Sequence, residues 1–271
     1  MALPLRLVGR VVYHVGQAAE IMEDASLKQI VSDNDIPANS LEEIHYKVVE
    51  IAAPLARGKV LDFPAGHGRL SRWLRKMGFD VTAGDIAPEN FRNPDIPVVK
   101  ADLEGRFPFP DNAFDAAFCI EGPEHTENPY HTFREFARIL KPGGRLIISF
   151  PNYSNLESRL RAVFYGVLEP VEYPDVSIPS KSYGHVSRQP FALLKMSLML
   201  AGLSIDTVEC EAVKWKQLLL YPLYLLIKLF TAVKGERGQK KYFLRDSNSY
   251  KVLMGGRSLI VLCTKRPYVA A

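Results

Sequence analysis

Short apolar runs alternate along the chain with longer stretches in which apolar residues recur at helical spacing. The runs predict strands at 59–63, 79–84, 96–100, 114–120, 145–150, 203–210 and 258–264. The periodic stretches predict helices over 3–31, from about 39 to near Gly58, and over 69–77, 86–92, 129–140 and 189–201. Several runs are almost continuously apolar, which is typical of parallel strands buried on both faces. The alternation therefore predicts a doubly wound α/β sheet.

One segment interrupts this order. Residues 211–257, called the insert below, separate the last two predicted strands by far more than a hairpin needs. Residues 218–227 of the insert are all apolar or aromatic, and residues 214–245 carry eight Lys or Arg side chains against Glu236 alone. We therefore divide the chain into an N-terminal helical extension at 1–38, a sheet domain at 39–210 and 258–271, and the insert.

The apolar run 218–230 admits several interpretations. It falls short of the roughly 20 residues of a transmembrane helix, and it contains Lys228. Apolar and aromatic residues beside a basic stretch fit a helix that lies in a membrane interface. A lid over an apolar pocket, a dimer contact and an ordinary core helix also fit, and the sequence leaves these alternatives open.

Composition excludes several classes of protein. The 271 residues suffice for one α/β domain with decoration, and a net charge of +4 is too mild to indicate a nucleic-acid partner. The three cysteines, Cys119, Cys210 and Cys263, are far apart and have no C-x-x-C spacing, which predicts reduced cytosolic thiols and no metal site. Arg6 and Arg10 interrupt the first apolar residues, so we expect no signal peptide.

Candidate chemistry begins at residues 59–69, where a predicted strand ends in Asp62 and a turn with Gly66 and Gly68 leads into a helix. Such a turn cradles nucleotide-like ligands, because glycine lets the backbone approach them closely. A carboxylate at the strand end would repel a pyrophosphate but would suit a ligand with ammonium and sulfonium groups. This pattern indicates S-adenosylmethionine and methyl transfer.

Further motifs follow in a fixed order. They are Val-Leu-Asp-x-x-x-Gly-x-Gly at 60–68, an acid at Asp85, Ala-Asp-Leu at 101–103, Phe-Pro-Phe-Pro-Asp-Asn-Ala-Phe-Asp at 107–115, Glu121 with Glu124-His125, and Arg-Ile-Leu-Lys-Pro-Gly-Gly-Arg-Leu-Ile-Ile-Ser-Phe-Pro-Asn at 138–152. Together they resemble the class I S-adenosylmethionine-dependent methyltransferases, especially the type 11 group of bacterial small-molecule enzymes. The resemblance implies a Rossmann-like, seven-stranded, mostly parallel sheet with an antiparallel last strand, and 39–210 with 258–271 as the methyltransferase domain.

The resemblance also implies a set of cofactor-binding residues: Asp62, Pro64, Ala65, Gly66, Gly68, Asp85, Ile86, Asp102, Leu103 and Glu121. In this family Asp62 and the backbone of 64–68 would face the methionine part of S-adenosylmethionine, and Asp85 would accept hydrogen bonds from the ribose hydroxyls. Asp102 would meet the adenine amino group. Asp85 could equally cap the predicted helix 86–92. Pro64 departs from the usual glycine, so this position offers neither a positive φ nor an amide donor.

Residues 121–125 would lie beside the sulfonium by the same resemblance. Imidazole and carboxylate groups are the usual general bases, so the candidate catalytic residues are His125, Glu121 and His185. His67, inside the turn, is expected to pack or cap instead. The usual interpretation of a lone histidine as structural stays open for His125 and His185.

The sequence thus predicts an S-adenosylmethionine-dependent methyltransferase acting on a small-molecule acceptor, lipid- or glycan-linked at the membrane surface. We expect a cytoplasmic protein, with peripheral contact at the inner membrane face through 213–241. A non-catalytic, membrane-associated module that binds S-adenosylmethionine is the alternative. A nicotinamide dehydrogenase is disfavoured because Ser71 stands where G-x-G-x-x-G needs its third glycine. Nucleic acid is not expected as an acceptor, because the Asn-Pro-Pro-Tyr type of signature is missing at 121–125.

Overall fold

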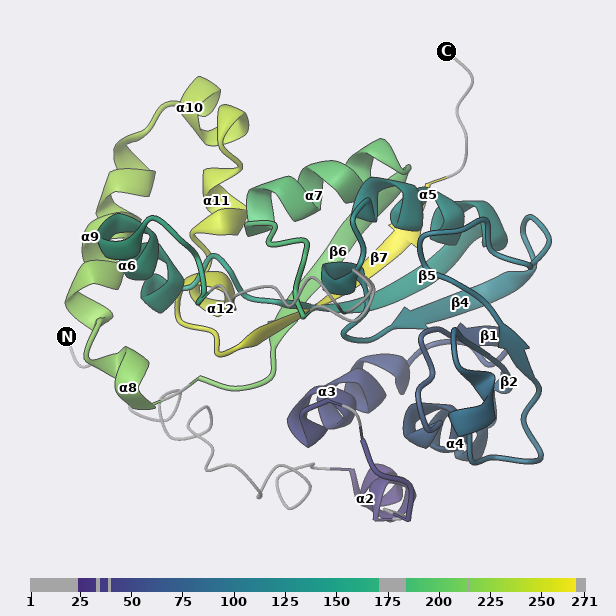
Figure 1. Cartoon of the computed structure of the whole chain (residues 1–271). Helices are drawn as coiled ribbons and strands as arrows, with labels where there is room; N and C mark the ends of the chain where they lie inside the picture. The colour runs from purple at the N-terminus through teal and green to yellow at the C-terminus, as the bar shows by residue number, and fades with distance from the viewer. Residues whose placement is uncertain (1–23, 33–34, 39, 171–183, 214, 267–271) are drawn as a thin grey trace, which may run out of the picture.

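A seven-stranded sheet forms the centre of the computed structural model, which describes residues 24–32, 35–38, 40–170, 184–213 and 215–266 (Figure 1). Its strands are β1 (Lys59–Asp62), β2 (Asp80–Asp85), β3 (Val98–Lys100), β4 (Phe114–Cys119), β5 (Leu140–Pro151), β6 (Leu203–Cys210) and β7 (Ser258–Lys265). The spatial order is β3-β2-β1-β4-β5-β7-β6, and only β7 runs antiparallel to its neighbours. The predicted fold class is confirmed.

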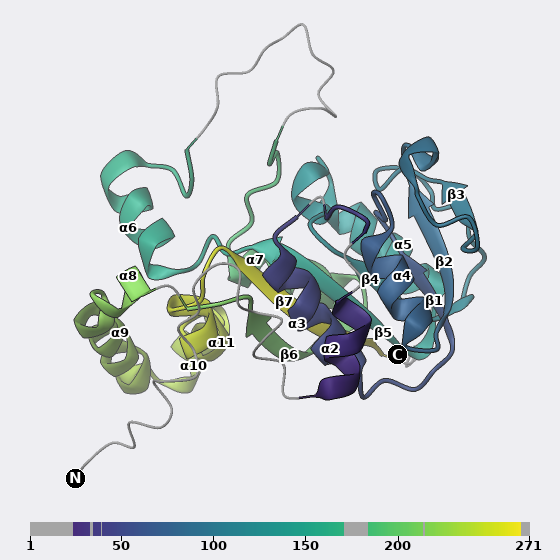
Figure 2. The same ribbon diagram turned by 90° about the horizontal axis from the view of Figure 1, so that it is seen from below.

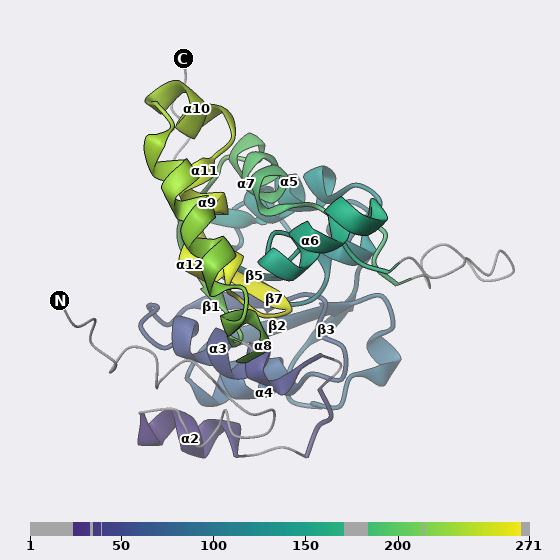
Figure 3. The same ribbon diagram turned by 90° about the vertical axis from the view of Figure 1, so that its left-hand side faces the viewer.

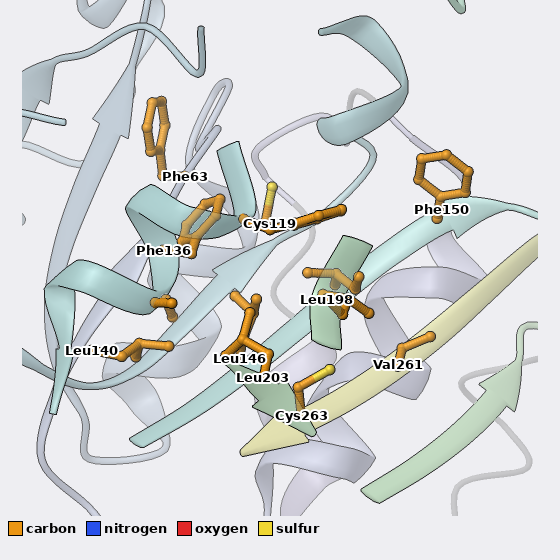
Figure 4. Close-up of a cluster of buried hydrophobic side chains, with 14 of the residues drawn as sticks. Phe63, Cys119, Phe136, Leu140, Leu146, Phe150, Leu198, Leu203, Val261 and Cys263 are labelled. Atoms are coloured by element: carbon orange, nitrogen blue, oxygen red, sulfur yellow. The ribbon is translucent and has the colours of Figure 1, made fainter. Parts of the chain in front are cut away.

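Helices cover both faces of the sheet (Figures 1 and 2). On one face lie α2 (Ala25–Val31), α3 (Glu42–Ala52) and α4 (Arg69–Lys76), and on the other lie α5 (Pro129–Ile139) and α7 (Phe191–Leu200). Trp73 of α4 is fully buried against the first face. Beneath α5 and α7, a second cluster includes Phe136, Leu198 and Val261 (Figure 4). Burial on both faces explains the continuously apolar strands of the sequence.

Three local predictions differ from the structure. The predicted helix 86–92 is wrong: only the 3₁₀ turn η1 (Pro88–Asn90) forms, and Pro94 soon follows it. A helix that the periodicity did not predict, α6 (Leu156–Tyr165), begins where the side chain of Asn155 accepts a hydrogen bond from the Ser158 amide. β5 begins at Leu140, five residues before the predicted strand. Of the predicted helix 3–31, the part up to residue 23 lies outside the described residues.

The insert is helical. Its elements are α8 (Trp215–Leu218), α9 (Tyr221–Val233), α10 (Glu236–Lys241), α11 (Leu244–Ser247) and α12 (Tyr250–Leu253). Leu223 and Ile227 of α9 pack against a small cluster that contains Leu156 and Leu253. Arg159 of α6 donates hydrogen bonds to the Ser247 carbonyl and to Oδ1 of Asn248. The insert is therefore packed onto α6.

Among the described residues, nothing covers the other face of α9 (Figure 3). Leu219, Leu225, Leu226, Leu229, Phe230 and Val233 are each at least half exposed. Within the described part of the chain, no helix is both long enough and apolar enough to cross a membrane.

Candidate active site

The turn after β1 is shaped by two glycines. Gly66 and Gly68 have φ angles of 53° and 90°, in the left-handed region that favours glycine. A Cβ at Gly68 would overlap Nδ2 of Asn93 and the ring of Phe91. The Gly66 amide donates to Oδ2 of Asp85 at 2.7 Å, so the end of β2 holds the turn in place.

A cavity of about 530 Å³ opens beside this turn, at the carboxyl ends of β1, β2 and β4. Asp62, at the end of β1, is 1% exposed and accepts a hydrogen bond from Oγ of Ser71 at 2.5 Å. Burial, together with the charge of nearby Asp85, raises the pKa of Asp62 to about 7. A cationic group bound here would compensate this buried acid.

Asp85 lies at the wall of the same cavity. Its Oδ1 accepts from the Ala87 amide at 2.9 Å, in addition to the bond that Oδ2 accepts from Gly66. Both oxygens retain a lone pair, so Asp85 can order the turn and still accept from a ligand hydroxyl. The alternative role of Asp85 as a helix cap is therefore only partly seen. Its side chain accepts from the Ala87 amide in a local turn, but the α-helix predicted over 86–92 does not form.

A second cavity of about 200 Å³ adjoins the first and is bordered by Pro64, Ile86, Asp102 and Leu103. Ile86 is 51% exposed at its rim, which offers an apolar surface on which a flat ring could stack. Oδ1 of Asp102 accepts from the Glu104 amide at 3.0 Å, which fixes the carboxylate at the edge. All ten predicted cofactor residues line one of these two cavities, and their contact with a cofactor stays a prediction.

A third cavity, of about 510 Å³, is bordered by the polar side chains of Tyr153, Arg161, Glu169 and His185, and by Glu121. Glu121 borders all three cavities. It has a φ of 51°, and Oγ of Ser149 donates to its Oε1 at 3.1 Å. Burial raises the pKa of Glu121, so its carboxylate is a stronger base than an exposed one. Glu121 is thus the group that links the first two cavities to the third.

His125 and His185 come together from distant parts of the chain. Their ring centroids are 5.3 Å apart. His185 borders the first and third cavities, and His125 borders the first and second. The structure therefore brings the three predicted catalytic residues to one junction. His67 lies in the first cavity's wall.

Several residues of these cavities carried no signal in the sequence. Ser40, just before α3, and His45, in its first half, border the first cavity, so the cavity lining comes from the segment before β1 as well as from the sheet. Burial and the neighbouring Arg69 lower the pKa of His45 to about 4, so it is neutral at physiological pH. Tyr153 and Glu169 follow β5, in a region where the sequence shows no recognisable motif.

Known proteins resemble this chain in sequence and in fold. A family model described as a methyltransferase domain matches residues 61–148. The ubiquinone biosynthesis O-methyltransferase of Xylella fastidiosa is 30% identical over 64% of this chain and 72% of its own length. The chain belongs to the class I S-adenosylmethionine-dependent methyltransferases. S-adenosylmethionine is the methyl donor of this family.

Other relatives match a shorter segment. The ubiquinone biosynthesis O-methyltransferase of Xanthomonas oryzae is 32% identical over 43% of this chain, and the chain spans about half of its length, 52%. An S-adenosylmethionine-dependent methyltransferase of known structure from Archaeoglobus fulgidus aligns with a TM-score of 0.52 at 17% identity, over 88% of this chain and 99% of its own. That likeness supports the fold.

Proposed function

We propose that this protein transfers the methyl group of S-adenosylmethionine to a hydroxyl oxygen of a small acceptor. In this proposal S-adenosylmethionine binds in the first two cavities, called the cofactor cavities below, and the acceptor binds in the third, called the acceptor cavity. The observation that carries the proposal is the position of Glu121, which borders both cofactor cavities and the acceptor cavity. The relatives named above methylate oxygen in quinone biosynthesis, to judge from their names, which favours a phenol-type hydroxyl.

In the proposed reaction, the acceptor O–H gives its proton to the carboxylate of Glu121. The oxygen lone pair then forms a bond to the methyl carbon while the carbon–sulfur bond breaks. The electron pair of that bond stays on sulfur, and the neutral thioether product leaves with the methylated acceptor. The sulfonium is already a good leaving group, so the site contributes mainly alignment of the oxygen within roughly 3–3.5 Å of the carbon.

The acceptor is proposed to reach the protein from a membrane surface. The exposed apolar face of α9 is followed by Lys234, Arg237, Lys240 and Lys241, all exposed. An apolar helix face beside basic side chains complements the acyl and headgroup layers of an anionic bilayer. The insert packs on α6, and Arg161 of α6 borders the acceptor cavity. This arrangement supports delivery of a lipid-linked acceptor to a protein that stays peripheral on the cytoplasmic face.

The test of the reaction uses the purified full chain, methyl-labelled S-adenosylmethionine, and a panel of dihydroxyphenols with and without an alkyl tail. We expect labelled ether product, and we expect Glu121→Gln to lower the turnover rate by about 10²-fold or more. Glu127→Gln, an exposed acid nearby, is the matched control and keeps full activity. Binding of S-adenosylmethionine without transfer to any phenol, alcohol, amine or thiol would favour the non-catalytic module.

The membrane part is tested by co-sedimentation with vesicles that contain anionic lipid. The double variant Leu225→Glu with Leu229→Glu is expected to lose binding. Leu193→Glu with Leu200→Glu, which alters exposed leucines on α7, is expected to bind as the wild type does. If the α9 variant sediments like the wild type, the membrane part of the proposal is wrong while the reaction is unaffected.

A further inference from the structure

We propose that Glu124, His125 and His185 bind a divalent transition-metal ion at the junction of the three cavities. A ligand atom from each of the three side chains lies within 4.8 Å of the other two. Three ligands about 2.1 Å from a common ion lie roughly 3–3.5 Å apart, so small side-chain rotations suffice to close the site. The residues come from the η2 turn (Pro123–His125) and from the segment that leads into α7.

The backbone holds these two segments together. The amides of Val186 and Ser187 both donate to the Glu124 carbonyl at 2.9 Å. These main-chain bonds hold His185 beside Glu124, and His125 directly follows Glu124 in the chain, so neither arrangement depends on the ligating side chains themselves. The cluster is therefore a feature of the folded backbone.

Each imidazole has a hydrogen-bond acceptor beside its Nδ1. Nδ1 of His125 lies 3.3 Å from the Gly184 carbonyl, and Nδ1 of His185 lies 3.2 Å from Oε1 of Glu169. A carbonyl and a carboxylate accept hydrogen bonds, so these contacts favour the tautomer with the proton on Nδ1, in which Nε2 has a lone pair for an ion. A ligating histidine commonly donates its other ring N–H to such a group. The hydroxyl of Tyr153 contacts both Glu169 and His185, which further fixes the position of the His185 ring.

Glu124 supplies the independent evidence for an ion. Its side chain is fully buried, and neither carboxylate oxygen has a hydrogen-bond partner among the described residues. A buried polar group without partners is costly, and an ion is one of its common explanations. A neutral carboxylic acid is the competing explanation, because burial also raises the pKa of Glu124 well above its usual value. The two explanations differ in whether the chain takes up metal.

Two imidazoles and one carboxylate favour ions such as Zn²⁺, Fe²⁺, Mn²⁺ or Co²⁺, and three protein ligands leave open coordination positions. The inference deepens the proposed function and rests on it for its role. A hydroxyl of the acceptor would occupy an open position, where the ion lowers its pKa, and Glu121 would take the proton. No metal site was predicted from the cysteine spacing, and the distance in sequence between His185 and the pair Glu124-His125 hid this cluster.

The test titrates Co²⁺ into the metal-stripped full chain and records the visible absorption, with S-adenosylmethionine and acceptor both left out. We expect one saturable site per chain. We expect the binding to weaken by about 10-fold or more in Glu124→Gln and in His185→Asn, since each removes one of three ligands. His131→Asn, whose histidine contacts the Gly105 carbonyl away from the cluster, is the matched control and is expected to bind as the wild type does.

Absence of saturable binding in the folded wild type would overturn the inference, as would equal binding in all four proteins. Circular dichroism shows whether each variant folds, and Tyr153→Phe offers a milder perturbation, expected to weaken Co²⁺ binding without removing a ligand. Methyl transfer that persists in excess chelator would refute the role of the ion and leave the proposed function standing. Specific Co²⁺ binding without any methyl transfer would refute the proposed function and leave the metal site standing.

Discussion

The raised pKa of Asp62 is expected to make the affinity for S-adenosylmethionine depend on pH. The structure places this carboxyl at the cofactor turn with a pKa of about 7, raised by burial. A cationic ligand prefers the charged form, and the raised pKa means that Asp62 becomes charged only above about pH 7. Cofactor affinity should therefore fall as pH is lowered through 7, and binding should release a proton.

The magnitude follows from the charged fraction. With a pKa near 7, roughly nine-tenths of the Asp62 carboxyls are charged at pH 8 and roughly one-tenth at pH 6, so the affinity should fall about tenfold between them. At pH 6, about 0.9 proton should be released for each ligand bound.

Isothermal titration calorimetry in buffers of different ionisation enthalpy measures both quantities. Asp62→Asn is the control, because comparison at each pH removes the titration of the ligand itself. The Asp62→Asn variant should bind S-adenosylmethionine more weakly than the wild type at pH 8. It should lack the tenfold change in affinity between pH 6 and pH 8 that the titration of Asp62 causes. An affinity that is constant from pH 6 to 8 in the wild type, with no proton released, would refute the reasoning.

Two further predictions concern stability. Gly68→Ala should lower the free energy of unfolding by more than about 2 kcal/mol in urea titrations, because it combines a positive φ with overlap of the new Cβ. Gly235→Ala, with no atom near the added Cβ, should change it by less than about 0.5 kcal/mol. Arg138→Ala should cost about 2–4 kcal/mol in the same assay, because the guanidinium bonds Glu135 through two nitrogens and little of either side chain is exposed. Arg134→Ala, exposed on the same helix, should be nearly neutral; equal losses for the two would contradict this account.

The strands of the sheet were predictable because burial on both faces produces nearly continuous apolar runs in the sequence. Each predicted strand has its counterpart, since near-continuous apolar runs such as the one ending at Cys119 have few other interpretations. The α-helix predicted over 86–92 was wrong because the prediction relied on the spacing of apolar residues and gave too little weight to Pro88 and the following Pro94. α6 was missed because the apolar residues of its last turn, Val163, Phe164 and Tyr165, face solvent and leave no continuous buried stripe.

The candidate site was predictable only where it follows the strand ends. Asp62 and Asp85 end parallel strands, and the topology brings such ends to one edge of the sheet. His45 and Glu169 reach the cavities through tertiary packing, for which no local pattern exists. The pairing of His125 with His185 likewise arises from main-chain bonds between distant segments. Long-range contacts of this kind are not encoded in spacing.

A crystal structure of the full chain with S-adenosylhomocysteine tests the central claim most directly. The account predicts the amino acid end of the ligand beside Asp62, its ribose at Asp85 and its adenine ring between Ile86 and Leu103. The sulfur should face Glu121 and the acceptor cavity. Ligand density elsewhere on the protein, or a sulfur turned away from Glu121, would contradict the assignment of this site.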